Sequence, residues 1–112
     1  MGYLHVPNLY KDQRILLFRE CFALEKVHGT SAHVTYERGR LRFHSGGASG
    51  PAFVALFNEA ELRERAIAAF GADGPAVVYG EAYGGKQQGM RATYGPELRF
   101  IVFEVKIGEL WL

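Results

Sequence analysis

The spacing of apolar residues predicts one clear helix, from Asn58 to Phe70. Leu62 and Ala66 lie one helical turn apart within it, so one side of the helix is apolar. Asn58 can cap the first turn, and Glu61 follows three residues later, as in a capping box. The charged residues between the apolar positions are predicted to face solvent.

Alternating or continuous apolar residues predict strands elsewhere in the chain. His33–Tyr36 and Leu41–Phe43 are expected to pair as a hairpin across residues 37–40. Ala76–Glu81 is interpreted as a buried strand that ends in a carboxylate, and Arg99–Val105 as a strand rich in aromatic and β-branched residues. Ile15–Leu24 is mostly apolar and fits either a helix or a strand.

Turn-rich stretches separate these segments at Ser45–Pro51, Gly71–Pro75 and Gly84–Gly89. Few of the predicted strands are separated by helices, which argues against a doubly wound parallel sheet. The pattern therefore predicts an α+β fold, with a mostly antiparallel sheet and one or two packed helices.

Composition narrows the class of protein without identifying it. The chain has 112 residues, of which 48% are hydrophobic and 22% charged, as expected for one small globular domain. The formal charge of +1 gives no overall field toward nucleic acid, although a local basic strip remains possible. The single cysteine, Cys21, permits no internal disulfide and is expected to be a small buried residue. No apolar run reaches the length of a membrane span, so we expect a cytoplasmic protein.

The hexapeptide Glu25–Thr30, with sequence Glu-Lys-Val-His-Gly-Thr, carries the strongest chemical signal. A lysine amine attacks phosphorus only in its neutral form, which desolvation or nearby positive charge favours. Gly29 would let the backbone pass close to a ligand. On its own, this pattern fits an ordinary surface lysine better than a nucleophile.

Further motifs downstream change that balance. The hexapeptide resembles the nucleophile motif of ATP-dependent RNA ligases of the nick-sealing branch, within the covalent nucleotidyltransferase superfamily. Val78–Gly85 resembles the family's motif III, and Phe100–Val105 resembles its motif IIIa. Lys86–Gly89 and Tyr94-Gly95 are similar to the loop between them. The resemblance covers roughly residues 24–105 and implies a nucleotidyltransferase fold.

The resemblance implies a role for each matching residue. Lys26 would attack ATP and carry AMP as a covalent adduct, with Mg²⁺ or Mn²⁺ as the expected metal. Glu81 would bind the ribose hydroxyls, Phe103 would stack on adenine, and Glu25 would contact the adenine edge. His28 and Gly29 would lie beside the nucleotide. Glu104 stands where the family usually has Asp, and it would bind the metal.

Several of these residues also have a purely structural interpretation. Glu81 could be an exposed carboxylate at a strand end, and His28 a turn residue. Phe103 alternates with Ile101 and Val105 on one face of its strand, and Phe103 could therefore be pure core. Lys86 and Arg91 could touch phosphates, but a solvated position is favoured for both. An exposed face is likewise at least as plausible as an RNA-binding strip for the arginines of the predicted hairpin, Arg38, Arg40 and Arg42.

The chain departs from the family pattern in two places. Ser45 stands where the family often has an arginine that contacts the nucleotide. The family's motifs IV and V, which supply a metal-binding Glu and two lysines, would lie beyond Leu112. We therefore expect residues 1–112 to form one domain, the first part of an adenylyltransferase domain, and to ligate RNA little or not at all. The competing hypothesis is a non-catalytic nucleotide- or RNA-binding module that self-associates or pairs with a second chain.

Overall fold

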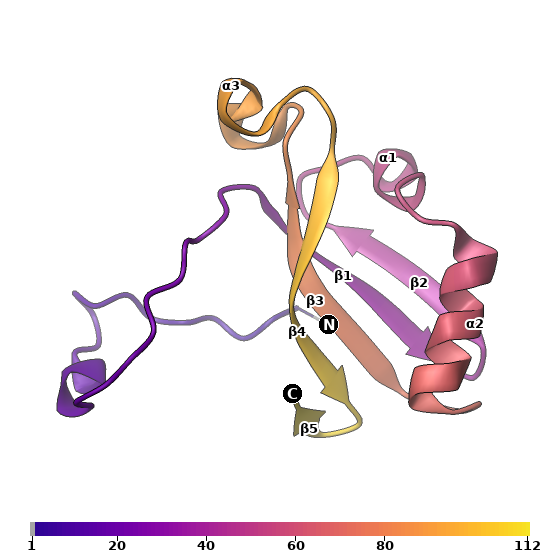
Figure 1. Ribbon diagram of the computed structural model, residues 1–112, viewed down its shortest axis with the longest axis horizontal. Helices are drawn as coiled ribbons and strands as arrows, with labels where there is room; N and C mark the ends of the chain where they lie inside the picture. Colours follow the sequence, from indigo (N-terminus) through magenta and orange to yellow (C-terminus); the bar gives the residue numbers. More distant parts are fainter. Residues whose placement is uncertain (1) are drawn as a thin grey trace.

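Five strands form one antiparallel sheet in the computed structural model, which describes residues 2–112 (Figure 1). The sheet order is β2-β1-β3-β4-β5. The strands are β1 Thr30–Glu37, β2 Arg40–Ser45, β3 Ala76–Tyr83, β4 Arg99–Ile107 and β5 Leu110–Trp111. The predicted α+β class with an antiparallel sheet is confirmed, and β5 is an addition to the predicted strands.

The hairpin of β1 and β2 follows directly from its turn residues. Arg38 and Gly39 have φ values of 52° and 74°, and a two-residue type I′ hairpin turn requires positive φ at both central residues. Glu37 pairs with Arg40 beside the turn, and the pairing continues to Ala32 and Ser45. The predicted hairpin is therefore confirmed, with longer strands than the alternation alone indicated.

Two α-helices connect β2 to β3. Helix α2, Glu59–Phe70, confirms the predicted helix, and the Asn58 side chain accepts the Glu61 N–H at 3.2 Å. The Glu61 carboxylate forms an ion pair with Arg65 at 2.6 Å. It therefore points along the helix and does not bond back to the Asn58 N–H, as it would in a full capping box. Helix α1, Gly50–Val54, lies partly in a stretch predicted as turn and is capped by Ser49.

Three short helical turns complete the secondary structure: η1 Arg14–Leu17, η2 Gln87–Gly89 and α3 Arg91–Tyr94. The last two lie between β3 and β4, where the sequence predicted only a glycine-rich loop. No helix of residues 2–112 combines the length and the apolar character needed to cross a bilayer.

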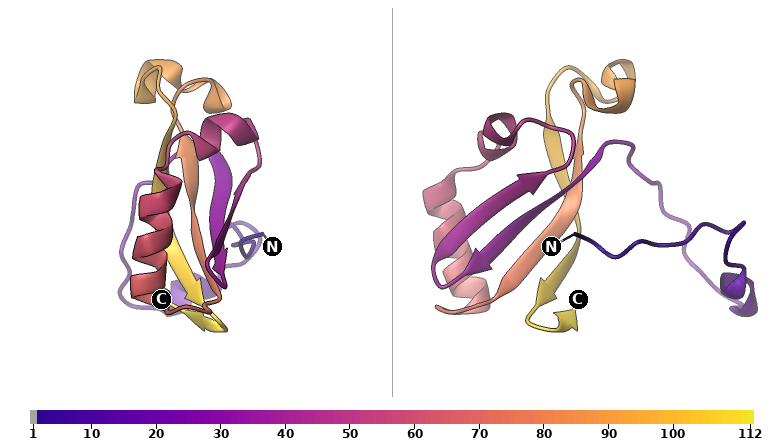
Figure 2. Two further views of the ribbon diagram at one scale, coloured as in Figure 1. Left: turned by 90° about the vertical axis from the view of Figure 1, so that its right-hand side faces the viewer. Right: turned by 180° about the vertical axis from the view of Figure 1, so that it is seen from behind.

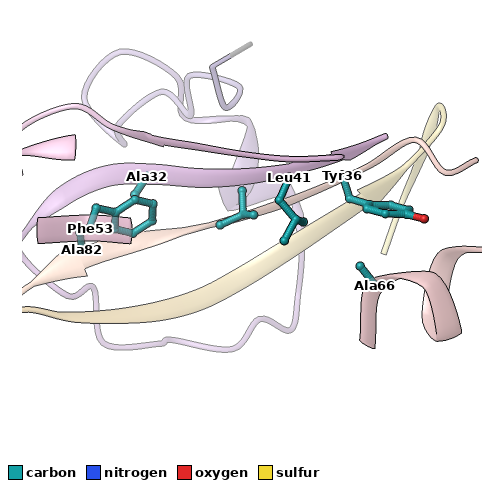
Figure 3. Close-up of a cluster of buried hydrophobic side chains, with 7 residues drawn as sticks. Ala32, Tyr36, Leu41, Phe53, Ala66 and Ala82 are labelled. Atoms are coloured by element: carbon teal, nitrogen blue, oxygen red, sulfur yellow. The ribbon is translucent and has the colours of Figure 1, made fainter. Parts of the chain in front are cut away.

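The core lies on the side of the sheet that α1 and α2 cover (Figure 3). Alternate residues of β1 point into it, because side chains of a strand alternate between the two faces. Phe53 of α1 is fully buried against the sheet, and the Tyr36 hydroxyl donates to the Gly71 carbonyl at 2.7 Å. The cluster consists of Ala32, Val34, Tyr36, Leu41, Phe53, Ala66 and Ala82. We call this side the covered face.

Within residues 2–112, no helix covers the opposite side of the sheet, and we call it the open face. It presents the residues that alternate with the core positions, namely Ser31, His33, Thr35 and Glu37 of β1, Arg40, Arg42 and His44 of β2, and Val77, Tyr79 and Glu81 of β3. In the right-hand view of Figure 2, α2 lies behind β1 and β2, and the N-terminal segment leads away from the sheet.

Strand β4 contains a bulge that corrects the predicted alternation. Gly80 of β3 pairs with Val102, whereas the preceding residue, Tyr79, pairs with Glu104. Phe103 is therefore the extra residue, and it lies on the open face together with Glu104. The predicted grouping of Phe103 with Val105 on one face is wrong, because the bulge shifts the register between them.

The N-terminal arm, residues 7–23, leads away from the sheet and returns to β1 (Figure 1). The prediction of a helix or strand over Ile15–Leu24 is wrong, since η1 is the only helical turn there among the described residues. Its large apolar side chains are at least half exposed in the described part of the chain, and Phe22 is 96% exposed. Cys21 is also exposed and not buried as predicted. An apolar sequence without a packing partner gains too little to hold regular structure.

Candidate functional site

A cavity lies on the open face, where two N-terminal segments meet residues of β1, β3 and β4. Its volume is about 680 Å³, within the range of small-molecule sites. Four of the predicted site residues line it: Glu25, Lys26, Glu81 and Phe103. They come from three parts of the chain that are far apart in the sequence. The other lining residues are Tyr3, Leu4, His5, Val6, Leu24, Val27, Ser31, Ile101 and Val102.

Glu25 and Lys26 belong to an extended segment that ends at Gly29. Both side chains are exposed at the cavity, whereas Gly29 is buried against β3. A Cβ atom at position 29 would lie 2.2 Å from the Ala82 carbonyl oxygen, far inside van der Waals contact. Glycine thus allows a close approach to the strand backbone, which sets the path of the chain just after Lys26.

Glu81 is held in place at the floor of the cavity. Its side chain is half-buried, and its Oε1 atom accepts the Gly29 N–H at 3.2 Å. Its pairing partners in the neighbouring strands are Ser31 of β1 and Ile101 of β4. The interpretation of Glu81 as a freely exposed strand-end carboxylate does not apply, because burial and this hydrogen bond restrict it.

Phe103 presents its ring to the cavity and does not enter the core. The residue is 51% exposed, so the interpretation as pure core is wrong. The Tyr3 ring stands edge-on to it, with centroids 5.0 Å apart and planes at 80°. Tyr3 also packs against Tyr79 and Trp111, at 5.2 and 5.6 Å. These contacts anchor the N-terminal segment beside an accessible aromatic ring.

Glu104 accepts a hydrogen bond from the Tyr3 hydroxyl. This hydrogen bond raises the pKa of Tyr3 above its ordinary value, and burial and the negative charge of Glu104 act in the same direction. Among residues 2–112, no three His, Cys, Asp or Glu side chains are grouped so as to hold a metal ion. Glu104 alone does not fit a metal site held by protein ligands.

The remaining predicted residues lie outside the cavity lining. His28 is exposed, and its N–H donates to the Tyr94 hydroxyl at 3.2 Å. Lys86 and Arg91 are exposed in the segment between β3 and β4. The Ser45 hydroxyl accepts the Ala48 N–H at 3.2 Å, which gives it a local role in the turn after β2.

Sequence reasoning missed two tyrosines that shape the site. Tyr3 forms part of the cavity wall and contacts Phe103, and the Tyr94 hydroxyl accepts a hydrogen bond from the His28 N–H. No local pattern could have identified Tyr3, because it meets its partners only after β3, β4 and β5 have assembled. Tyr94 lies in a segment whose similarity to the family loop was noted, but nothing in that similarity pointed to His28.

The cavity combines an amine, two carboxylates and a flat aromatic ring. A primary amine is a potential nucleophile, and a fixed carboxylate can accept hydrogen bonds from paired hydroxyls. An exposed aromatic ring offers a stacking surface for a planar base. Comparison with known proteins gave no match to any family model, curated protein or solved structure.

Proposed function

We propose that this chain is the adenylyltransferase portion of an ATP-dependent RNA ligase, with a partial nucleotidyltransferase fold. The observation that carries the proposal is the convergence of Glu25, Lys26, Glu81 and Phe103 on one cavity. They were selected from three separate motifs, and periodicity alone does not require them to meet. A cavity of about 680 Å³ is also large enough for a nucleotide.

Each residue has a defined task in this proposal. The neutral Lys26 Nζ attacks the α-phosphorus of ATP, an N–P bond forms, and the bond to the pyrophosphate leaving group breaks. One of the two amine protons passes to solvent, which leaves a neutral phosphoramidate nitrogen. Phe103 stacks on the adenine, and Glu25 contacts the adenine edge. Glu81 accepts hydrogen bonds from the ribose, since Gly29 already fixes its position. Catalysis of this type depends mainly on positioning and electrostatic stabilisation.

In a complete enzyme, AMP would pass from Lys26 to a 5′-phosphate RNA end, and a 3′-hydroxyl would then displace it. ATP, supplied with Mg²⁺ or Mn²⁺, is the proposed cofactor. We expect residues 1–112 to perform at most the first of these steps, because the family's phosphate-binding lysines and metal-binding Glu have no counterpart in this sequence.

The proposal is tested by incubating the purified chain with α-labelled ATP and MgCl₂, followed by denaturing electrophoresis. Wild type should retain acid-labile label. The amount of label on Lys26→Ala should be at least about tenfold lower, since removal of the nucleophile eliminates covalent capture. Lys11→Ala, an exposed lysine of the N-terminal arm, is the matched control. Equal labelling of wild type and Lys26→Ala would refute the assignment. GTP in parallel tests the related capping chemistry.

The N-terminal arm supports a second candidate function, a binding module that pairs with another chain. Tyr10, Leu17 and Phe22 are 94%, 84% and 96% exposed, and large exposed apolar surface commonly marks an interface. Sedimentation velocity over a range of concentrations decides this point. Concentration-dependent association without AMP transfer would favour the module, whereas a monomer that carries labelled AMP would exclude it.

A further inference from the structure

A second concave site lies on the open face, at the tip of the β1–β2 hairpin. It has a volume of about 350 Å³ and is lined by Thr35, Glu37, Arg38, Arg40 and Arg42. Register explains the grouping, because Thr35 pairs with Arg42 and Glu37 with Arg40 across the two strands. We call Arg38, Arg40 and Arg42 the arginine strip.

The arginine strip has an excess of positive charge. Three guanidinium groups share the concavity with one carboxylate, that of Glu37. The ion pairs formed within residues 2–112 involve Arg14, Arg63, Arg65 and Lys106, and none of the strip arginines. Guanidinium groups present several N–H donors in a planar fork that matches phosphate oxygens. The strip therefore has the chemistry of a phosphate-binding surface.

The strip and the Lys26 cavity occupy the same face of the sheet. Along β1, Ser31 lines the Lys26 cavity, His33 follows, and Thr35 and Glu37 line the arginine concavity. Four residues of a strand span about 13 Å, so the two sites are separated by that distance along β1. The His33 and His44 rings stack between them, with centroids 4.8 Å apart.

The spacing of the strip favours an extended polyanion over a single small anion. Arg40 and Arg42 are alternate residues of β2, about 6.7 Å apart, and Arg38 lies next to them in the turn. Such a row offers successive charges to successive phosphates of a single strand. It presents no aromatic residue for base stacking among its lining, so it would bind backbone and not sequence.

We propose that the arginine strip binds the phosphate backbone of a single-stranded nucleic acid that runs along β1 and β2 toward the Lys26 cavity. The identification of that strand as RNA, with its end at the cavity, rests on the proposed function. The binding itself does not, because it depends only on the charge and spacing of the strip.

The test is fluorescence anisotropy with the full chain and an end-labelled single-stranded RNA of about 16 nucleotides, without ATP. Titrations at several salt concentrations between about 50 and 200 mM give the slope of log affinity against log salt. Wild type should bind, and Arg40→Gln with Arg42→Gln should weaken binding about tenfold at the lowest salt. Loss of two phosphate contacts should also reduce the slope by about 1.4.

Three controls make the result specific. Arg63→Gln with Arg65→Gln removes the same charge from α2 and should leave affinity unchanged within about twofold. Arg40→Lys with Arg42→Lys keeps the charge but loses the planar fork. It should keep the wild-type salt slope and lose less affinity than the glutamine pair, which separates loss of charge from misfolding. Inorganic phosphate at the concentration of the oligonucleotide's phosphates should not displace the RNA, because separate ions lack the linked charges of a polyanion.

An equal loss in the two glutamine double variants would overturn the proposal, since it would show an effect of net charge alone. Unchanged affinity and slope in Arg40→Gln with Arg42→Gln, or full displacement by free phosphate, would also overturn it. The labelling assay of Lys26 contains no RNA and this assay contains no ATP. Failure of one proposal on wild-type protein is therefore distinguishable from failure of the other.

Discussion

The two faces of the sheet are built from the same strands but hold different kinds of residue. On the covered face, Ala32, Val34 and Tyr36 of β1 are 5% exposed or less and pack under α1 and α2. On the open face, the intervening residues are polar and lead from the Lys26 cavity to the arginine strip. Neighbouring residues of one strand therefore serve folding on one face and, in our proposal, binding on the other.

This separation means that the two properties should respond to different mutations. Apolar burial on the covered face contributes most of the free energy of folding, because it removes the most apolar surface from water. On the open face, Phe103 and the strip arginines remain hydrated in the folded state, so replacing them changes that free energy less. The predictions below compare the faces, beginning with the largest expected effect.

Phe53→Ala should lower the free energy of unfolding by about 3–5 kcal/mol, because the ring is fully buried and its loss leaves a cavity. Phe103→Ala is the matched change on the open face, where the ring is 51% exposed. It should cost less than half as much while reducing AMP labelling. Urea unfolding followed by circular dichroism measures both, and equal costs would show that the faces do not differ as described.

Gly29→Ala should cost roughly 1–3 kcal/mol, because the new methyl group would collide with the Ala82 carbonyl and displace one strand from the other. The same shift would move Lys26, so AMP labelling should fall as well. Gly50→Ala is the control, since a Cβ there meets nothing within 4 Å. Urea unfolding and the labelling assay report the two effects, and wild-type behaviour of Gly29→Ala in both would contradict the close approach.

His33 should make stability depend on pH by a smaller amount. Burial lowers the pKa of His33, and the positive charge of the neighbouring His44 adds to this effect. The unfolded chain therefore binds the proton more readily than the folded chain. The stabilising contribution is complete above the unfolded value of about 6.5 and is lost as the pH falls through the folded pKa.

Urea unfolding between about pH 7.5 and 5 measures this dependence. His33→Gln should reduce the loss of stability over that interval, whereas His5→Gln, in the exposed N-terminal segment, should leave it unchanged. An identical pH dependence in wild type and His33→Gln would assign the effect to other groups.

Local signals were sufficient for most of the covered face. The hairpin depended on alternation and on a turn at Arg38-Gly39, and α2 depended on helical spacing and the Asn58 cap. Helix α1 was missed, although Ser49 followed by Pro51 is a recognisable helix start. Its five residues are too few for periodicity to show.

The open face was less predictable because its geometry depends on pairing between distant segments. The bulge that places Phe103 on the same face as Glu104 arises from the register of β3 and β4, and no feature of either strand alone specifies it. Similarity of motifs selected Lys26 and Glu81, but the wall that Tyr3 adds was not visible in any motif. The prediction of regular structure in the N-terminal arm was wrong, because an apolar sequence indicates burial but does not show which part of the molecule it packs against.

The contact between Tyr3 and Glu104 turns the N-terminal arm from a free tail into a closed loop. The chain is fastened at Tyr3 and again at Gly29, where the N–H meets Glu81, with about 25 residues between. Closing a flexible loop of that length costs roughly 3 kcal/mol of chain entropy. The aromatic contacts of Tyr3 must offset that cost whenever the cavity wall is in place, so the same tyrosine sets how often the cavity is complete.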